Sequence, residues 1–427
     1  MKIISSESLF VKFYLNRFIY IILILEISFA MKVFSQTFIP DPIIINEDFN
    51  AVYLKEFDKE YAVDSNMEAI HAYDQIKSGK LREKKTKFTD LIYAVFYIEN
   101  STDQEKKLIL EIDNSQMDYY ELYIIDRENH EAILIGKGGD TLPFYHRNIR
   151  NRNFIEPFSL NENAETCFIL KIDDRERSTS IPLTLYDRSA FLKNELWSGF
   201  FHSLYFGGLL FIGLFSLILG YIIRFRVFYA YGLYALVMAF YMFANLGFGY
   251  QYFYPWQPEV QRILPIFMNP FLYVSFIIFA SGYFKIKSKK PRAFNYVIIH
   301  FILTVLTIIF YVSTGFRMPL QNYIFSNYIL LIYTFIVLGI LIFNGFLYDK
   351  TKAYYFLTAV SILFISGLTF ALTDAGILRM EWLPTNPLLI GAIFEFGIFS
   401  VALIVEVRRI NETKNKLLEE KAQQQKE

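Results

Sequence analysis

One polar stretch, residues 138–154, carries side chains that could recognise a small molecule. It reads GGDTLPFYHRNIRNRNF and places acidic, basic and aromatic groups close together in the chain. Planar guanidinium groups suit carboxylates and other anions, and the face of a tyrosine ring suits a sugar. The stretch therefore predicts either ligand contacts or a loop that organises the fold. The candidate ligand contacts are Asp140, Tyr145, His146, Arg147, Arg150 and Arg152.

A second set of polar side chains lies within long apolar runs of the chain. Glu395 falls in the last of these runs, roughly 12 Å from its start along a helix. An ionisable group within a membrane span is costly and suggests a functional site, here for a proton or a ligand. The alternative is a structural hydrogen bond inside a bundle, with His300, Asn269 or Asn344 as its partner. We interpret His202 and His300 as packing residues rather than metal ligands.

The sequence lacks the motifs of several common catalytic, nucleotide-binding and metal-binding sites. It contains no H-E-x-x-H motif, no G-x-S-x-G motif and no Walker loop. Five scattered histidines and a single cysteine, Cys167, argue against a metal site and exclude an intrachain disulfide. The formal net charge of zero argues against a nucleic-acid partner. We therefore expect neither an enzyme nor a protein with a cofactor or a metal.

The elements that must hold these residues fall into two regions of different composition. Charged residues are frequent before residue 197, whereas apolar runs dominate from there onward. Short strand-forming runs such as LIYAVFYIEN, KKLILEIDN and CFILKID recur in the first region, with turn residues between them. Apolar residues alternate within these runs, as at Phe96 and Ile98. The pattern predicts an antiparallel β-sandwich over residues 37–195.

The first 35 residues have the features of a secretory signal. Lys2, Lys12 and Arg17 precede an apolar run that is short for a membrane span. Small residues follow near Ser35, where a signal peptidase would cut. We expect a cleaved signal peptide over residues 1–35, with an uncleaved signal anchor as the alternative. Either form sends the following region across the membrane.

Seven apolar segments follow the predicted sandwich, each long enough to cross a hydrocarbon core of about 30 Å as a helix. With the sandwich outside, the inner loops and the exit of the last helix carry eleven basic residues and the outer loops three. This asymmetry agrees with the secretory signal. We therefore predict a multi-pass protein of the inner (cytoplasmic) membrane, with a periplasmic sandwich, a membrane domain over residues 197–405 and a cytoplasmic C-terminus. The predicted spans are 197–223, 227–248, 263–284, 293–314, 323–348, 353–373 and 387–405.

The strings FYIEN, LILEIDN, ELY, GGDTLPFYHR, FIL and SIPLTL follow one another in the first region. Together they resemble the type-two extracellular domain of bacterial seven-transmembrane receptors with diverse intracellular signalling modules. The closing string GAIFEFGIFSVALIVEVRRIN resembles the last helix of the membrane module of that family. The resemblance implies a jelly-roll sandwich like that of carbohydrate-binding modules, serving as a periplasmic sensor. It implies a transmembrane sensory receptor for an undefined periplasmic ligand, which we expect to be a carbohydrate or a small anion.

Residues 406–427 are expected to form a cytoplasmic helical tail, because they contain good helix formers and neither Pro nor Gly. Their apolar spacing predicts a short coiled-coil seam between two copies of the chain, with a solvated helix as the alternative. Receptors that the chain resembles usually continue into a histidine kinase, a cyclase or a DNA-binding module, and 22 residues cannot hold one. We therefore expect the output module either further along a longer chain or on a separate cytoplasmic partner such as a histidine kinase. The seam residues are Leu403, Val407, Ile410, Lys414 and Leu417.

Two other functions fit the same features. An envelope scaffold would hold a protein partner with the sandwich and recruit a cytoplasmic one with the tail. A transporter would place Glu395 in the path of its substrate. In either case the membrane domain would be surrounded by membrane lipid. The sequence shows no internal repeat of the kind that many transporters carry.

Overall fold

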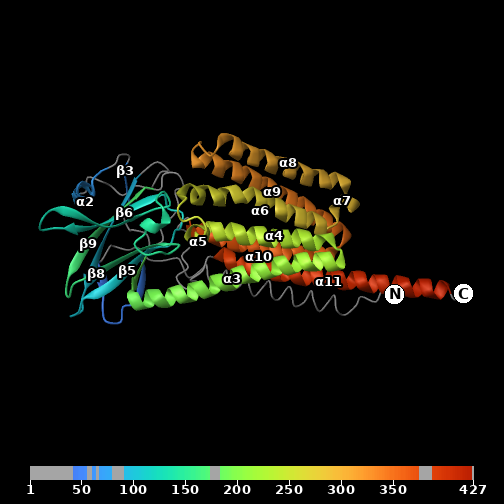
Figure 1. Cartoon of the computed structure of the whole chain (residues 1–427), viewed down its shortest axis with the longest axis horizontal. Helices are drawn as coiled ribbons and strands as arrows, with labels where there is room; N and C mark the ends of the chain where they lie inside the picture. Colours follow the sequence, from blue (N-terminus) through green and yellow to red (C-terminus); the bar gives the residue numbers. More distant parts are fainter. Residues whose placement is uncertain are drawn as a thin grey trace.

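The computed structural model describes residues 42–54, 60–63, 67–78, 91–173, 183–374 and 387–425. Its β-strands gather at one end of the molecule and its long helices form a bundle at the other (Figure 1). This order of a β domain and then apolar helices confirms the predicted fold class. The predicted signal segment 1–35 lies outside the described residues, as do residues 180–182 of the string SIPLTL.

Two sheets form the β domain, and in the described residues one has six strands and the other four. The first sheet has the order β1-β4-β9-β6-β7, and β3 also pairs with β4. The second sheet has the order β2-β10-β5-β8. The strands are β1 (Ile43–Ile45), β2 (Ala51–Leu54), β3 (Glu60–Val63), β4 (Leu91–Asn100), β5 (Lys106–Ile112), β6 (Tyr119–Asp126), β7 (Glu131–Gly138), β8 (Phe154–Leu160), β9 (Glu165–Asp173) and β10 (Leu183–Asp187).

A single apolar core between the sheets makes the domain a β-sandwich. Leu108 and Leu110 of the second sheet belong to one buried cluster with Phe96 and Ile98 of the first. Phe96 stacks on Phe168 of β9, with ring centroids 5.2 Å apart. The alternation predicted at Phe96 and Ile98 is therefore confirmed, because both side chains are buried in this core.

One strand pairing departs from the predicted antiparallel arrangement. β1 runs parallel to β4, with Ile43 opposite Ile98. Two parallel strands cannot be joined by a tight hairpin, and β2, β3 and helix α2 (Ala69–Lys77) lie between these two strands in the chain. Alternation in a sequence identifies the two faces of a strand but not the direction of its neighbour. The parallel pair was therefore outside what the pattern could predict.

Seven helices in the described part of the chain are long and apolar enough to cross a membrane. Proline occupies the first turn of α6 and α8, where its missing N–H is not needed. Two short helices, α5 (Phe248–Tyr252) and α7 (Ile286–Lys289), lie in connections between the long ones. The long helices are α3 (Arg188–Ile223), α4 (Arg226–Asn245), α6 (Pro258–Tyr283), α8 (Pro291–Thr314), α9 (Leu320–Tyr348), α10 (Lys350–Asp374) and α11 (Pro387–Gln424).

The first and last of these helices are longer than a membrane span requires. α3 has 36 residues and begins at Arg188, nine residues before the predicted span at 197. Its start is fixed by Asp187, whose carboxylate accepts a hydrogen bond from the Ser189 N–H at 2.8 Å. α11 has 38 residues and extends past the other helices at the far end of the bundle (Figure 1). Each helix therefore continues from the bundle into the space beyond it.

Aromatic side chains fill the centre of the bundle. Tyr234 of α4 stacks against Phe276 of α6 and Phe396 of α11, with centroids 4.8 and 5.0 Å away. Phe279 of α6 and Phe399 of α11 meet edge to face at 4.9 Å. Because lipid tails are as apolar as these rings, close packing rather than the hydrophobic effect holds such helices together. The last helix is thus packed against α4 and α6 at the level of Glu395.

Candidate functional site: the junction between the sandwich and the bundle

The polar stretch singled out in the sequence lies where the sandwich meets the helices. It connects β7 to β8 and contains one turn of 3-10 helix, η2 (Phe144–His146). Gly139 opens it with φ 151°, and a Cβ there would approach the carbonyl oxygen of Asp118 to 2.1 Å. We call residues 139–153 the junction loop. Its position beside α5 can be followed at the boundary of the two parts in Figure 1.

Arg147 holds the junction loop in shape from within. Its Nη1 donates to the carbonyl oxygens of residues 151–153, at 2.7, 2.7 and 3.3 Å. The guanidinium lies over the rings of Phe144 and Phe154, 4.7 and 4.1 Å from their centroids. Burial lowers the pKa of Arg147 to about 10, so the group remains charged at neutral pH. Arg147 is therefore an internal anchor of the loop.

A buried carboxyl group links the loop to both sheets. Glu156 of β8 accepts a hydrogen bond from the Tyr120 hydroxyl of β6 and another from the Asn148 side chain of the loop, each at 2.5 Å. Gly136 of β7 leaves the space that this carboxylate occupies, because a Cβ there would lie 2.3 Å from Glu156 Oε2. Burial raises the pKa of Glu156 to about 7. The loop is thus fixed to an ionisable group between the sheets.

The end of the loop is bonded to the outer face of the second sheet and to α3. Asn153 donates to Glu111 at 2.7 Å and to Asp113 at 2.6 Å. Asn151 donates to Glu195 of α3 at 2.5 Å. Burial, followed by the nearby charge of Asp113, raises the pKa of Glu111 to about 8. These bonds connect the loop with the segment of α3 that precedes the predicted span.

Other contacts of the loop reach the outer end of the bundle. The Phe144 N–H donates to the Pro255 carbonyl at 2.9 Å. The Tyr250 hydroxyl of α5 donates to the Leu142 carbonyl at 2.5 Å, and its ring meets Phe144 edge to face at 5.5 Å. The guanidinium of Arg147 lies 5.6 Å from the centroid of the same tyrosine ring. The anchor that shapes the loop therefore also touches the membrane domain.

A second loop of the sandwich, between β5 and β6, contacts the end of α4. The Gln116 side chain donates to the carbonyl and to the side-chain oxygen of Asn245, both at 2.8 Å, and Ser115 Oγ donates to the same carbonyl at 3.2 Å. Gly247 then turns the chain with φ 80°. A Cβ at Gly247 would lie 2.7 Å from the Ser115 Cβ. Both loops of the sandwich are thus in close contact with the helices.

Charged side chains also connect the sandwich with the helices at the junction. Arg262 of α6 lies 3.7 Å from Asp118 and 4.0 Å from Asp140, measured from its Nε to the carboxylate oxygens. Asp140 is fully buried, and its backbone N–H donates to the Met117 carbonyl at 2.8 Å. Arg152 lies over the Phe248 ring of α5 at 5.6 Å. The arrangement pairs acidic groups of the sandwich with a basic group of the membrane domain.

The six residues proposed from the sequence therefore have two different environments. Asp140 and Arg147 are buried and Arg152 is half-buried, all of them within the junction. Tyr145, His146 and Arg150 are exposed, and the first two rings meet at 4.8 Å. The structure does not bring the six side chains together around one cavity. It adds residues that the sequence analysis did not single out, namely Gln116, Asn148, Tyr250 and Arg262.

The polar residues of the bundle also have different partners from those considered. Glu395 is fully buried and accepts hydrogen bonds from the Tyr234 hydroxyl at 3.0 and 3.1 Å. His300 instead bonds Thr334 of α9 at 2.8 Å. Asn344 donates to a carbonyl of its own helix at 2.8 Å, and Asn269 is half-buried on α6. The expected partners of Glu395 were wrong because a sequence does not show which helices are adjacent.

Charged groups secure α11 where it leaves the bundle. Glu406 is buried and lies 2.6 Å from Lys352 of α10 and 3.2 Å from Lys285, which precedes α7. Arg409 pairs with Asp349 at 2.5 Å. We call these groups the inner latch. They fix the last helix to two loops at the end of the bundle opposite the sandwich.

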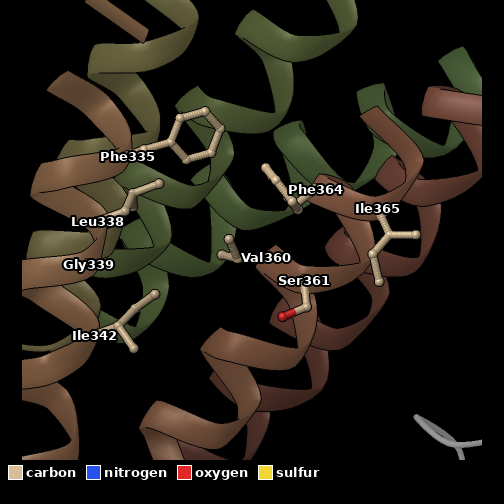
Figure 2. A pocket seen from close by; sticks show the side chains of 8 residues that line it. All are labelled: Phe335, Leu338, Gly339, Ile342, Val360, Ser361, Phe364 and Ile365. Atoms are coloured by element: carbon tan, nitrogen blue, oxygen red, sulfur yellow. The ribbon is translucent and has the colours of Figure 1, made fainter. Parts of the chain in front are cut away.

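A groove of about 430 Å³ lies between α9 and α10. Figure 2 shows its lining, in which Ser361 supplies the one side-chain oxygen among otherwise apolar groups. Such a lining suits a lipid chain rather than a polar ligand. In the described residues, no group of three or more His, Cys, Asp or Glu side chains could hold a metal ion.

Comparison with known protein families matches both parts of the chain. Residues 89–187 match the family model described as 7TMR-DISM extracellular 2. Residues 198–406 match the model described as 7TM diverse intracellular signalling. The first match ends with β10, and the second begins within α3. No curated protein matches the chain.

Proposed function

The chain belongs to the seven-transmembrane receptors with diverse intracellular signalling modules, and we propose that its junction carries a ligand-induced change from the sandwich to the bundle. Membership in this family makes the chain a transmembrane sensory receptor with an extracellular sensor domain. The observation that supports the proposed route is the junction loop, which is bonded at once to the sandwich, through Asn148 and Glu156, and to the membrane domain, through Leu142 and Tyr250.

The proposed ligand is a carbohydrate or a small anion in the periplasm. Tyr145, His146 and Arg150 are exposed on the junction loop and offer an aromatic face, an imidazole and a guanidinium fork. They lie within three residues of Arg147, which contacts Tyr250 of the membrane domain. A ligand held by the exposed groups would therefore act directly on an anchor of the loop.

The mechanism requires two arrangements of the bundle with different affinities for the ligand. A ligand can shift such an equilibrium only by its difference in binding free energy between the two. Hydrogen bonds from Gln116 and Tyr250 give the sandwich two points of contact with the helices, so a shift in either loop changes the strain on α4 and α5. α3 supplies a further connection, because Glu195 binds the loop and the same helix enters the bundle.

The proposed output is a cytoplasmic partner, such as a histidine kinase or another output module, recruited by α11. The excess of basic residues in the inner loops supports a cytoplasmic position for this end. Leu417 and Leu418 are 53% and 55% exposed on the tail, where two apolar side chains on a solvated helix suit a partner helix or a second copy of the chain. Of the predicted seam residues, Leu403 is instead buried in the core of the bundle and Val407 packs against that core. A homodimer through the remaining part of the seam, Ile410, Lys414 and Leu417, is part of the proposal.

The test uses the intact receptor in lipid nanodiscs, with spin labels on the tail and on the loop between α9 and α10. Glycans and small organic acids are added separately. We expect one class to change the label distance, and Arg150→Ala to abolish the response without loss of folding. Lys107→Ala, on the exposed part of β5, is the control and should respond like the wild type. No change with either class would contradict the proposed ligand.

An envelope scaffold is the second candidate, because the edge strand β7 exposes two apolar side chains. Ile133 and Leu134 are 48% and 44% exposed at the margin of the first sheet. An edge strand of this kind can pair with a strand of another protein. Crosslinking in intact cells would reveal a stoichiometric envelope protein attached to β7 if this function is correct, together with no response to small molecules.

A further inference from the structure

The carboxyl group of Glu395 sits in an unusual place for a charge. It belongs to α11 and is fully buried against α4, among the aromatic rings described above. Among the described residues its only hydrogen-bond donor is the neutral hydroxyl of Tyr234, 3.0 Å away. No lysine or arginine of the described part forms an ion pair with it. A carboxylate here would be an unpaired charge in a medium of low polarity.

Burying such a charge costs far more free energy than burying a neutral carboxylic acid. The free energy of transferring an isolated ion from water into an apolar interior is so unfavourable that the group takes up a proton instead. Charged groups inside membrane spans are accordingly paired, solvated or functional. A protonated Glu395 needs only an acceptor and a donor, and the Tyr234 hydroxyl supplies the donor. The geometry thus favours the acid form in the arrangement described here.

A second, independent feature points to the same site. Tyr205 of α3 is buried inside the bundle. Its hydroxyl has no hydrogen-bond partner among the described residues. It lies within electrostatic reach of Glu395. One turn nearer the sandwich on the same helix, His202 is buried and bonded through Nδ1 to the Ser198 carbonyl at 2.6 Å. The His202 ring meets Phe248 of α5 at 5.2 Å, and Arg152 of the junction lies over the same Phe248 ring.

These residues form a line of polar groups from the junction into the membrane. We propose that Glu395 is a proton-binding site of this receptor, loaded from the outer side past His202 and Tyr205. In the arrangement described here the site holds its proton. Loss of that proton places a charge between α3, α4 and α11 and drives these helices apart. The ligand of the site is the proton itself, and its binding needs no ligand on the sandwich.

The groups around Glu395 come from α3, α4, α6 and α10, which packs against α11 and contributes the ring of Phe356, 5.9 Å from that of Phe276. α4 contributes Tyr234 directly, and its Tyr231 is occupied with the Phe396 carbonyl at 2.7 Å. α3 contributes Tyr205, near which Tyr241 of α4 also lies. α6 presents the rings of Phe276 and Phe279 to this region. Among the described residues these phenols and the carboxyl group itself are the titratable groups of the site, and the carboxyl group is the one among them that is ionised in water at neutral pH.

The experiment is infrared spectroscopy of the full chain in lipid nanodiscs, titrated from about pH 5 to about pH 9. This whole range lies above the ordinary pKa of a glutamic acid side chain. We expect the carbonyl stretch of protonated carboxylic acids at neutral pH to be weaker in Glu395→Gln than in the wild type. The difference is the band of Glu395, because Glu111 and Glu156 of the sandwich contribute to both spectra. Glu412→Gln, on the exposed tail, is the matched control and should leave the band unchanged. Tyr205→Phe, which keeps the ring and removes the hydroxyl, should shift the pH at which the band disappears.

Identical bands at neutral pH in the wild type and in Glu395→Gln would overturn the proposal. If Glu395→Gln does not fold, carbodiimide modification of the wild type decides instead, because such reagents add to protonated carboxyl groups in apolar surroundings. Peptide mapping should then find the modification on Glu395 at neutral pH, decreasing as the pH rises, and its absence would contradict the site. In folded wild-type protein, the distance between spin labels on the tail should change with pH, with the same midpoint as the infrared band. In folded Glu395→Gln the distance should not change with pH. Equal movement in both would overturn the coupling.

Discussion

At the scale of single residues, the junction depends on a few buried polar groups. Arg147 illustrates why residue type alone did not decide its role. An arginine beside tyrosine and histidine suits an anionic ligand. The guanidinium of Arg147 instead donates hydrogen bonds to three carbonyl groups of its own loop and lies over aromatic rings. The sequence could predict a polar loop at this point. It could not predict which side chains turn inward, because that depends on the bundle that covers the loop.

Replacement of Arg147 by lysine should destabilise the junction. A lysine ammonium cannot make the same set of bonds in one plane or stack on the Phe154 ring. We expect a loss of about 3 kcal/mol in the free energy of opening of the loop. Hydrogen exchange of amides 139–153 in the intact receptor measures it. Arg150→Lys, at an exposed position three residues further along the same loop, should change the exchange little, and equal effects would refute the anchoring role.

The buried carboxyl group of Glu156 predicts a pH dependence. Its folded pKa, about 7, lies above its ordinary value of 4.5, so the native sandwich binds more protons than the unfolded chain between these values. The stabilisation is complete below about pH 4.5 and is lost as the pH rises through about 7, about 3 kcal/mol in total. The unfolding temperature of the sandwich in the intact chain should fall across this window.

Glu156→Gln is the variant that isolates this group, since the amide keeps the size of the side chain without its charge. The fall in unfolding temperature across the same window should be smaller in the variant than in the wild type. Glu111, with a pKa of about 8, contributes in the same direction from about pH 4.5 up to about pH 8 and remains in both proteins. A wild-type sandwich that gains stability between pH 5 and 7 would contradict the assigned direction.

At the scale of elements, the sequence predicted the strands and the spans better than their ends and pairings. Alternation placed Phe96 and Ile98 correctly in the core, and hydropathy placed seven spans. The start of α3 at Arg188 was missed because its first turns are polar enough to belong to a soluble domain. The parallel pairing of β1 and the contact of Glu395 with Tyr234 depend on which elements become neighbours. These relations come from tertiary packing, which local sequence does not encode.

The turn between α4 and α5 should be sensitive to a single methyl group. Gly247→Ala places a Cβ at a positive φ and 2.7 Å from the Ser115 Cβ, so the loop between β5 and β6 must move away from α4. We expect faster exchange of the Ser115 and Gln116 amides and a loss on the order of 2 kcal/mol at the contact. Gly207→Ala on α3, where a Cβ meets nothing within 4 Å, is the control. Unchanged exchange in Gly247→Ala would show that the two parts are not tightly packed.

At the scale of the whole molecule, the receptor has a contact system at each end of one helix bundle. The junction holds the sandwich at the outer end, and the inner latch holds α11 at the other. Both α3 and α11 extend beyond the bundle, and they contact each other within it. A change at either end therefore has a continuous packed route to the other. This arrangement is the physical basis of the proposed signal transfer.

Coupling between two sites is reciprocal, so it can be tested without knowing the ligand. Glu406→Gln weakens the inner latch by removing the charge that pairs with Lys352 and Lys285. Hydrogen exchange of the junction loop, amides 139–153, is then measured in the intact receptor in nanodiscs. We predict altered protection of the loop in Glu406→Gln and wild-type protection in Glu412→Gln. A junction loop that exchanges as in the wild type, while α11 near residue 406 exchanges faster, would contradict the transfer of a signal through the bundle.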